Sequence, residues 1–190
     1  MDYLFLLDAQ SSFQLNRDSL IKRIESKRDD LVDLTCQLVR IPTVNPPGDA
    51  YTDCARLLGE RLKNKEFCVS FHRAEGTPGD SDRYPRTNLV ARFEGDGQGP
   101  CVHFNGHLDV VVPGKGWSEE PFVPAVKDGR VYGRGTCDMK GGIAASVIAL
   151  ESLLEEGIHF SGAIEFSRTV DEETGGYGGV AFLAGKGLFS

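Results

Sequence analysis

The sequence lacks the cysteine spacing of a disulfide framework or a structural zinc knuckle. The 190 residues include five cysteines, an odd number, and no two of them form a Cys-x-x-Cys pair. This usage favours a reducing compartment, so we expect a cytoplasmic protein. The five positions are Cys36, Cys54, Cys68, Cys101 and Cys137.

Long apolar runs and basic clusters are also missing. No apolar stretch approaches the roughly 20 residues that a membrane-spanning helix needs. The start of the chain is apolar only over residues 4–7, between two aspartates, which is too short and too acidic for a signal peptide. The net charge is −7, with no basic cluster that could hold a nucleic-acid backbone. We therefore expect neither a membrane nor a nucleic acid as a partner.

The chain does contain enough apolar sequence for a packed core, with 40% hydrophobic and 26% charged residues. Apolar residues at helical spacing predict helices over 18–40, 51–64, 142–156 and 179–186. Extended patterns predict strands over 67–71, 88–93, 100–105 and 162–170. The glycine-rich stretch 95–99 is expected to turn the chain between two of these strands. Strands alternating with helices predict an α/β fold, as a three-layer α/β/α sandwich with a mainly parallel sheet.

Acidic and imidazole side chains follow the predicted strands directly. His107 and Asp109 come after one strand, and Glu172 and Glu173 come after the last one. Asp138 stands in a glycine-rich block that leads into the long third helix. In open α/β sheets, ligands bind beyond the carboxyl ends of the strands. We therefore expect these three clusters to converge on one point.

This set of side chains suits a divalent cation of the zinc type. His107 can offer one ring nitrogen, while Asp109 can accept a hydrogen bond from the other nitrogen and orient the ring. Asp138 has two carboxylate oxygens and can bridge two ions that lie about 3.5–4 Å apart. Of the adjacent Glu172 and Glu173, one can bind a metal. The other can take a proton from water and pass it to a leaving amine.

Three motifs, taken in order, resemble a known family. They are His107-x-Asp109, the block Gly-Arg-Gly-x-x-Asp138-Met-Lys-Gly-Gly, and Asp171-Glu172-Glu173. Together they are similar to the zinc metallopeptidases and deacylases that include acetylornithine deacetylase, succinyl-diaminopimelate desuccinylase, aminoacylase and glutamate carboxypeptidase. The resemblance covers residues 18–190 and leaves 1–17 as an amino-terminal extension.

The resemblance implies a hydrolase that cleaves the amide bond of an N-acyl amino acid or small peptide, using two Zn²⁺ or Co²⁺ ions. It implies that His107 and Glu173 each bind one ion and that Asp138 bridges both. Glu172 would be the catalytic general base and acid, and Asp109 would orient His107. Complete members of the family are often homodimers.

The chain also departs from the family pattern. Members carry a further acidic ligand and a late histidine, and the sequence ends at Ser190 before either. The resemblance also implies a separate lid and dimerisation domain, which we expect this chain to lack. We therefore interpret 18–190 as the amino-terminal part of the catalytic domain, incomplete at its carboxyl end. A second hypothesis stays open: a truncated, catalytically inactive fragment with at most weak metal binding.

Other polar positions have plainer interpretations. The remaining three histidines lack an acidic context and are expected to be structural or exposed. Cys137 lies beside the bridging aspartate, but we expect it to be a small buried residue rather than a ligand. The glycine-rich block 133–142 lacks the Gly-x-x-x-x-Gly-Lys-[Ser/Thr] order of a phosphate loop, which argues against nucleotide binding. Asp171 is expected to support the loop that presents the glutamate pair.

Overall fold

The structure is a computed structural model that describes residues 17–189. The expected amino-terminal extension, 1–17, lies outside the described residues apart from Arg17, where the first helix begins. The helices are α1 (Arg17–Ser26), α2 (Arg28–Val39), α3 (Tyr51–Lys63), α4 (Gly141–Glu155) and α5 (Val180–Gly185). The strands are β1 (Cys68–Arg73), β2 (Thr87–Glu94), β3 (Cys101–His107), β4 (Ala125–Lys127), β5 (Arg130–Tyr132) and β6 (Ala163–Thr169). Short helical turns span Thr136–Lys140 and Glu172–Thr174.

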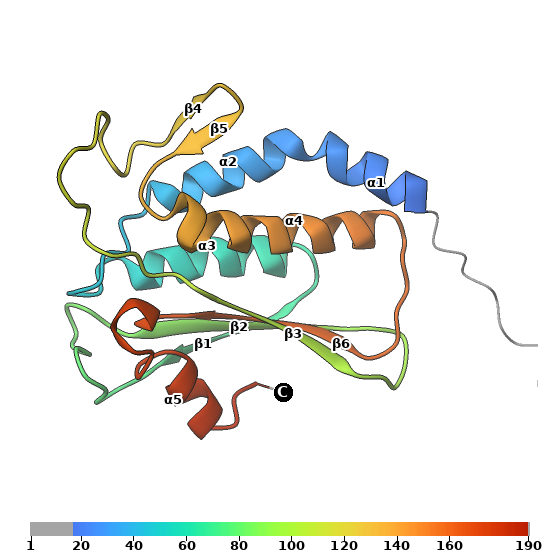
Figure 1. Cartoon of the computed structure of the whole chain (residues 1–190). Coiled ribbons are helices and arrows are strands. Elements are labelled where there is room, and N and C mark those ends of the chain that lie inside the picture. Colours follow the sequence, from blue (N-terminus) through green and yellow to red (C-terminus); the bar gives the residue numbers. More distant parts are fainter. Residues whose placement is uncertain (1–16, 190) are drawn as a thin grey trace, which may run out of the picture.

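A four-stranded sheet lies at the centre of the fold, with helices on both faces. Its strand order is β1-β2-β6-β3, and β4 and β5 form a separate hairpin. Helices α1 to α4 lie on one face of the sheet, and α5 lies on the other (Figure 1). The expected α/β class, with a central sheet between helical layers, is confirmed.

The sheet is mixed, rather than mainly parallel, over the described residues. β3 pairs with β6 in parallel, whereas β1–β2 and β2–β6 are antiparallel. The chain turns at 95–99 as expected, but β6 lies between β2 and β3. Main-chain hydrogen bonds of 2.8 Å and 3.0 Å join Gly95 and Gly97 to Gly162, so the turn binds the start of β6. Parallel strands need a long crossover, and here that crossover contains α4.

The hydrophobic core fills the space between the sheet and helices α2, α3 and α4. It includes Leu34 and Leu58 from the helices and Leu89 and Phe166 from the strands. The single helix expected over 18–40 is divided at Lys27, whose Nζ lies 2.7 Å from a carboxylate oxygen of Glu155 on α4. Among residues 17–189, no helix is long and apolar enough to cross a membrane.

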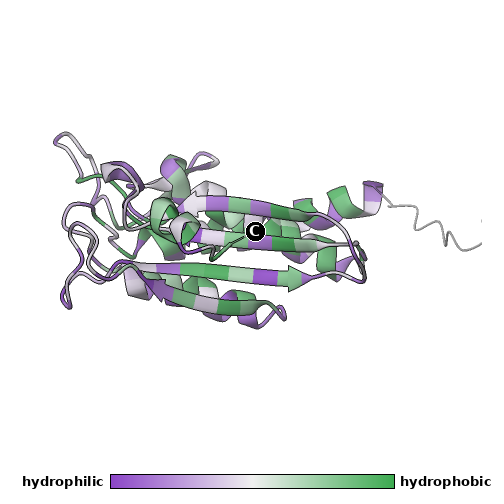
Figure 2. Cartoon of the chain, turned by 90° about the horizontal axis from the view of Figure 1, so that it is seen from below, coloured by the Kyte–Doolittle hydropathy of each residue, from purple (hydrophilic) through white to green (hydrophobic). Residues whose placement is uncertain are grey.

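The parallel pair determines where polar side chains gather. The register places His107, the last residue of β3, opposite Thr169, the last residue of β6. Both strands therefore end at the same edge of the sheet, and the segments after them leave side by side. The loops at the two ends of the sheet are richer in hydrophilic residues than the strands between them (Figure 2).

Candidate metal centre

The candidate metal centre lies just beyond the paired ends of β3 and β6. Asp109 lies in the loop after β3, and Glu172 and Glu173 form the turn after β6. Asp138 comes from the segment Thr136–Lys140, which precedes α4. The five residues expected to form a site, His107 included, therefore meet at one end of the sheet.

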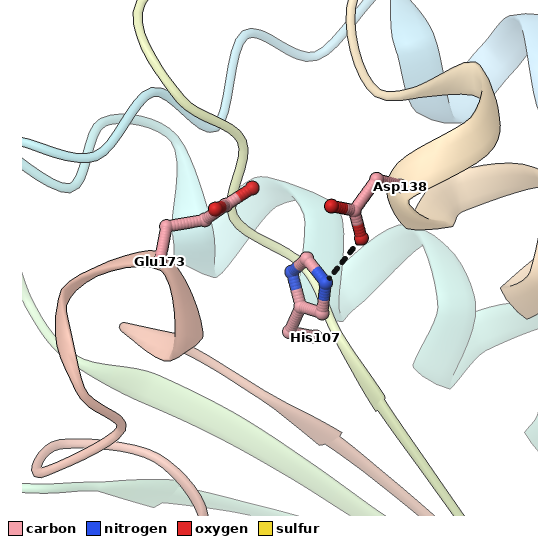
Figure 3. A group of neighbouring side chains, drawn as sticks. All are labelled: His107, Asp138 and Glu173. Carbon is pink, nitrogen blue, oxygen red and sulfur yellow. Dashed lines mark hydrogen bonds and ion pairs between the residues drawn. The ribbon is translucent and has the colours of Figure 1, made fainter.

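Three of these side chains converge on one small space. One ligand atom each from His107, Asp138 and Glu173 can be chosen so that all three lie within 4.8 Å of one another. His107 Nε2 lies 2.9 Å from Asp138 Oδ1, and Glu173 approaches from the opposite side (Figure 3). Imidazole nitrogen and carboxylate oxygen are ligands that zinc-type cations take in proteins. The donor set therefore fits a divalent cation.

The ring of His107 is oriented by the backbone of Asp109. Nδ1 lies 3.0 Å from the main-chain carbonyl oxygen of Asp109. A carbonyl oxygen can only accept, so Nδ1 carries the hydrogen and Nε2 faces Asp138. Burial acts to lower the pKa of His107, but hydrogen bonds with Asp109 and Asp138 raise it to about 9. The surrounding carboxylates thus favour positive charge at this point.

Asp109 is fully buried and connects the loop after β3 to the turn after β6. Its Oδ1 lies 3.6 Å from His107 Nδ1, so the backbone carbonyl makes the shorter contact with the ring. Its carboxylate accepts hydrogen bonds from the main-chain N–H groups of Glu172 (3.2 Å) and Glu173 (3.0 Å). Burial acts to raise the pKa of Asp109, but the nearby imidazole of His107 and a hydrogen bond from Asn45 hold it below its usual value. Asp109 contacts the glutamate pair as closely as it contacts the histidine.

The two adjacent glutamates have different surroundings. The pKa of Glu173 is raised, first by burial and then by the negative charge of Asp138. The side chain of Glu172 is 59% exposed, and its Oε2 lies 3.8 Å from His107 Nε2. Glu173 can therefore serve as a ligand while Glu172 remains open to an incoming molecule.

A buried polar network behind the glutamate turn was not expected from the sequence. The carboxylate of Asp171 accepts hydrogen bonds from the hydroxyl of Tyr51 (3.0 Å), the amide of Asn45 (3.3 Å) and Nε of Arg86 (3.0 Å). All four residues are buried. Asp171 also has a φ of 62°, a left-handed conformation that aspartate adopts more readily than most residues. It lies directly beneath the turn that it was expected to support.

Glycines make room for the guanidinium of Arg86 in this network. A Cβ added at Gly48 would lie 2.4 Å from Arg86 Nη1, and one at Gly79 would lie 2.2 Å from Nη2. Nη1 donates to the carbonyl oxygen of Pro47 at 2.7 Å. A Cβ added at Gly178 would likewise lie 2.7 Å from Arg86 Cγ, so glycines from three separate loops line the space that this side chain occupies.

The remaining polar positions differ from one another. The expectation of a buried Cys137 is wrong: this residue and the neighbouring Asp138 are exposed. His103 has a structural setting, with Nε2 2.8 Å from the hydroxyl of buried Ser167. His159 is exposed and pairs with Asp96.

Comparison with known proteins points in one direction. Residues 103–189 match the sequence profile of peptidase family M20/M25/M40. The succinyl-diaminopimelate desuccinylase of Stenotrophomonas maltophilia is 39% identical over 157 residues, which cover 81% of this chain and 38% of the relative. That of Acinetobacter baylyi is 39% identical over 148 residues, covering 77% of this chain and 36% of the relative. The chain thus spans little more than a third of the curated relatives it matches.

Solved structures agree with these matches. A Bacillus cereus aminopeptidase shares 27% identity and a TM-score of 0.63, covering 79% of this chain and 38% of that one. Human carnosine dipeptidase 1 shares the fold, with a TM-score of 0.77 at 22% identity over 89% of this chain and 37% of that one. Because the profile and the sequence relatives lead to the same group of enzymes, this chain is similar to peptidase family M20/M25/M40, most clearly over residues 103–189.

Proposed function

We propose that this chain carries the metal-binding and proton-transferring part of a hydrolase that cleaves the amide bond of an N-acyl amino acid or small peptide. The convergence of His107, Asp138 and Glu173 at the end of two parallel strands carries this proposal. The similarity to succinyl-diaminopimelate desuccinylases supports an N-acyl amino acid as the substrate.

The proposed cofactor is a co-catalytic pair of Zn²⁺ or Co²⁺ ions, held by His107 on one side and Glu173 on the other. Asp138 would be shared by both, and its side chain is 73% exposed, so its oxygens are open to two ions. When bound, the ions would polarise the scissile carbonyl and make water more acidic. The raised pKa values of His107 and Glu173 support this assignment, because nearby carboxylate charge contributes to both and a cation would neutralise it.

Glu172 is the proposed general base and acid. Its exposed carboxylate can take a proton from the attacking water and hand it to the departing nitrogen. Asp109 does not contact the reacting atoms in this scheme. It orients His107 through its backbone and holds the turn of Glu172 through its carboxylate.

A cytoplasmic location is part of the same proposal. All five cysteines lie within residues 17–189, and none of them forms a disulfide. Free thiols are usual in a reducing compartment.

A fragment with at most weak metal binding and no turnover is the second candidate. One observation favours it: the group of possible metal ligands that converges within the described residues has three members, which is few for two ions. With Asp138 counted for both ions, each ion would have two protein ligands, whereas a zinc site of this type usually has three or four.

The test is to purify the 190-residue chain, titrate it with Zn²⁺ or Co²⁺ by calorimetry, and assay it on N-succinyl and N-acetyl amino acids. The proposal expects two ions per chain and measurable hydrolysis. It also expects Glu172→Gln to keep the metal stoichiometry and lower kcat about 10²- to 10⁴-fold, because a general base of this kind contributes that much.

Glu25→Gln is the matched control, because it makes the same substitution at an exposed position on α1. It should leave both metal binding and turnover unchanged. A kcat in Glu172→Gln equal to that of the unaltered chain would refute the role of Glu172. A chain that binds less than one ion and turns over nothing would establish the fragment instead.

A further inference from the structure

The segment between α2 and α3 runs alongside the residues that follow His107. The hydroxyl of Thr43 donates to the carbonyl oxygen of Leu108 at 2.5 Å. Main-chain hydrogen bonds of 2.9 Å then join Val110 N to Thr43 O and Asn45 N to Val110 O. These bonds place the side chain of Asn45 beside the candidate centre, although about 60 residues separate the two in sequence.

The amide of Asn45 links both acidic loops. Its Nδ2 lies 3.1 Å from Asp109 Oδ2, 3.3 Å from Asp171 Oδ1 and 2.8 Å from the hydroxyl of Thr174. Two of these neighbours are carboxylates, so the amide presents its N–H₂ group to them. Asn45 is only 3% exposed, and water therefore has little access to replace these contacts.

The contacts continue from Asn45 to the glutamate pair. The Asp109 oxygen that Asn45 touches, Oδ2, also accepts the main-chain N–H of Glu173, and Oδ1 accepts that of Glu172. A rotation of the Asp109 carboxylate would therefore displace both glutamates. Thr174, the last residue of the same short helical turn, is bound by Asn45 directly.

We propose that Asn45 is a positioning residue, whose amide orients the Asp109 carboxylate and so sets where Glu172 and Glu173 lie relative to His107. The functional part of this inference rests on the proposed metal-dependent hydrolase. An amide suits this position between two buried carboxylates. Its N–H₂ group can donate a hydrogen bond to each of them, and it adds no further buried charge. Replacing it removes contacts to both loops at once and leaves every proposed ligand in place.

The test is a titration of the 190-residue chain and its Asn45→Ala variant with Co²⁺ alone, followed through the visible absorption of the bound ion. We expect the Kd for Co²⁺ to rise about 10- to 100-fold, because groups that orient metal ligands have effects of this size. Hydrogen–deuterium exchange of the metal-free chain gives a second readout. The amides of Glu172 and Glu173 should exchange faster in Asn45→Ala, because the acceptor that protects them is no longer held.

Thr43→Val is the matched control. It removes one buried hydrogen bond from the same segment and keeps the shape of the side chain, but that bond goes to a backbone carbonyl. We expect it to lower the melting temperature without moving the Co²⁺ affinity or the exchange of the glutamate amides. If Asn45→Ala does not fold, Asn45→Ser keeps one donor and is measured in the same way.

The outcomes separate the two proposals. Unchanged amide exchange at Glu172 and Glu173 in the Asn45 variant would overturn the positioning role, whether or not Co²⁺ binds. Equal effects of Asn45→Ala and Thr43→Val on Co²⁺ affinity would also overturn it. If the unaltered chain binds no Co²⁺, the proposed function fails, while faster exchange in Asn45→Ala alone would still establish that Asn45 holds the glutamate turn.

Discussion

Two buried arginines, Arg86 just before β2 and Arg168 on β6, have very different surroundings. Arg86 is 4% exposed, forms a 3.0 Å ion pair with Asp171 and donates to two backbone carbonyl groups. Arg168 is 1% exposed, and no carboxylate within residues 17–189 lies within 4.0 Å of it. It donates to the hydroxyl of Ser146 at 2.8 Å and packs over the ring of Phe166.

The difference shows that burial alone does not tell whether a charged residue stabilises or destabilises the fold. Arg86 compensates Asp171, so removing the arginine would expose the full cost of a buried carboxylate. Arg168 already bears an uncompensated cost: burial lowers its pKa, and its Nε has no hydrogen-bond partner among residues 17–189. One arginine supports the turn of the candidate centre, whereas the other fills space between β6 and α4.

The largest effect is expected for Arg86→Met. The substitution keeps much of the side-chain volume but leaves Asp171 buried without its cation. We expect the free energy of unfolding to fall by about 3–5 kcal/mol, as for other buried pairs that lose one partner. Urea unfolding followed by circular dichroism measures this change.

The same experiment has two controls. Arg73→Met removes a pair with Asp80 that is partly exposed, and it should cost clearly less. Adding Asp171→Asn to Arg86→Met removes both charges and should recover part of the loss. A double variant as unstable as the single one would mean that the charge of Asp171 is not the cause.

Arg168→Met should change stability in the opposite direction. It removes a buried cation that has no carboxylate partner and keeps an unbranched side chain against Phe166. We expect the free energy of unfolding to rise by about 1 kcal/mol, because desolvation of the charge is relieved. Thermal unfolding measures the shift, with Arg168→Lys as the control that retains the charge. A loss as large as that of Arg86→Met would show that the bonds of Arg168 to Ser146 and to the Phe104 carbonyl outweigh its desolvation.

The smallest effect is expected for Glu155, which supplies an exposed reference for both arginines. Hydrogen bonds from Lys27 and Lys65, with their charges, lower the pKa of Glu155 to about 2. Because the folded pKa lies below the unfolded value of 4.5, this contribution is present above pH 4.5 and is lost as the pH falls toward 2. Glu155→Gln should cost about 0.2–1 kcal/mol at pH 7, and less at pH 3. Equal losses at both values, measured by urea unfolding, would contradict the ion-pair origin.

The class of the fold and the residues of the candidate centre were predictable for one reason: both depend on local patterns. Apolar periodicity indicated the helices, and the acidic and histidine motifs stood directly after predicted strands. Strand pairing was harder, because the turn at 95–99 looks the same whether or not its two strands are neighbours. The catalytic and ligand roles of the five residues stay predictions that the experiments above address.

Asn45, Tyr51 and Arg86 could not be recognised in advance. Each is an ordinary polar residue in its local sequence, and each becomes important through partners that lie 64 to 126 residues away. Burial makes such residues structurally important, because a polar side chain that loses its contacts with water must form hydrogen bonds within the protein.

Motif spacing states which side chains follow which strand, and so which chemical groups the candidate centre can contain. The arrangement of those groups in space depends on how distant segments pack. The parallel register of β3 with β6 brings His107 and the glutamate turn side by side. The segment before α3 then places the amide of Asn45 between two buried carboxylates. Motif spacing is a property of neighbours along the chain, whereas these contacts exist only once distant segments have packed together and excluded water.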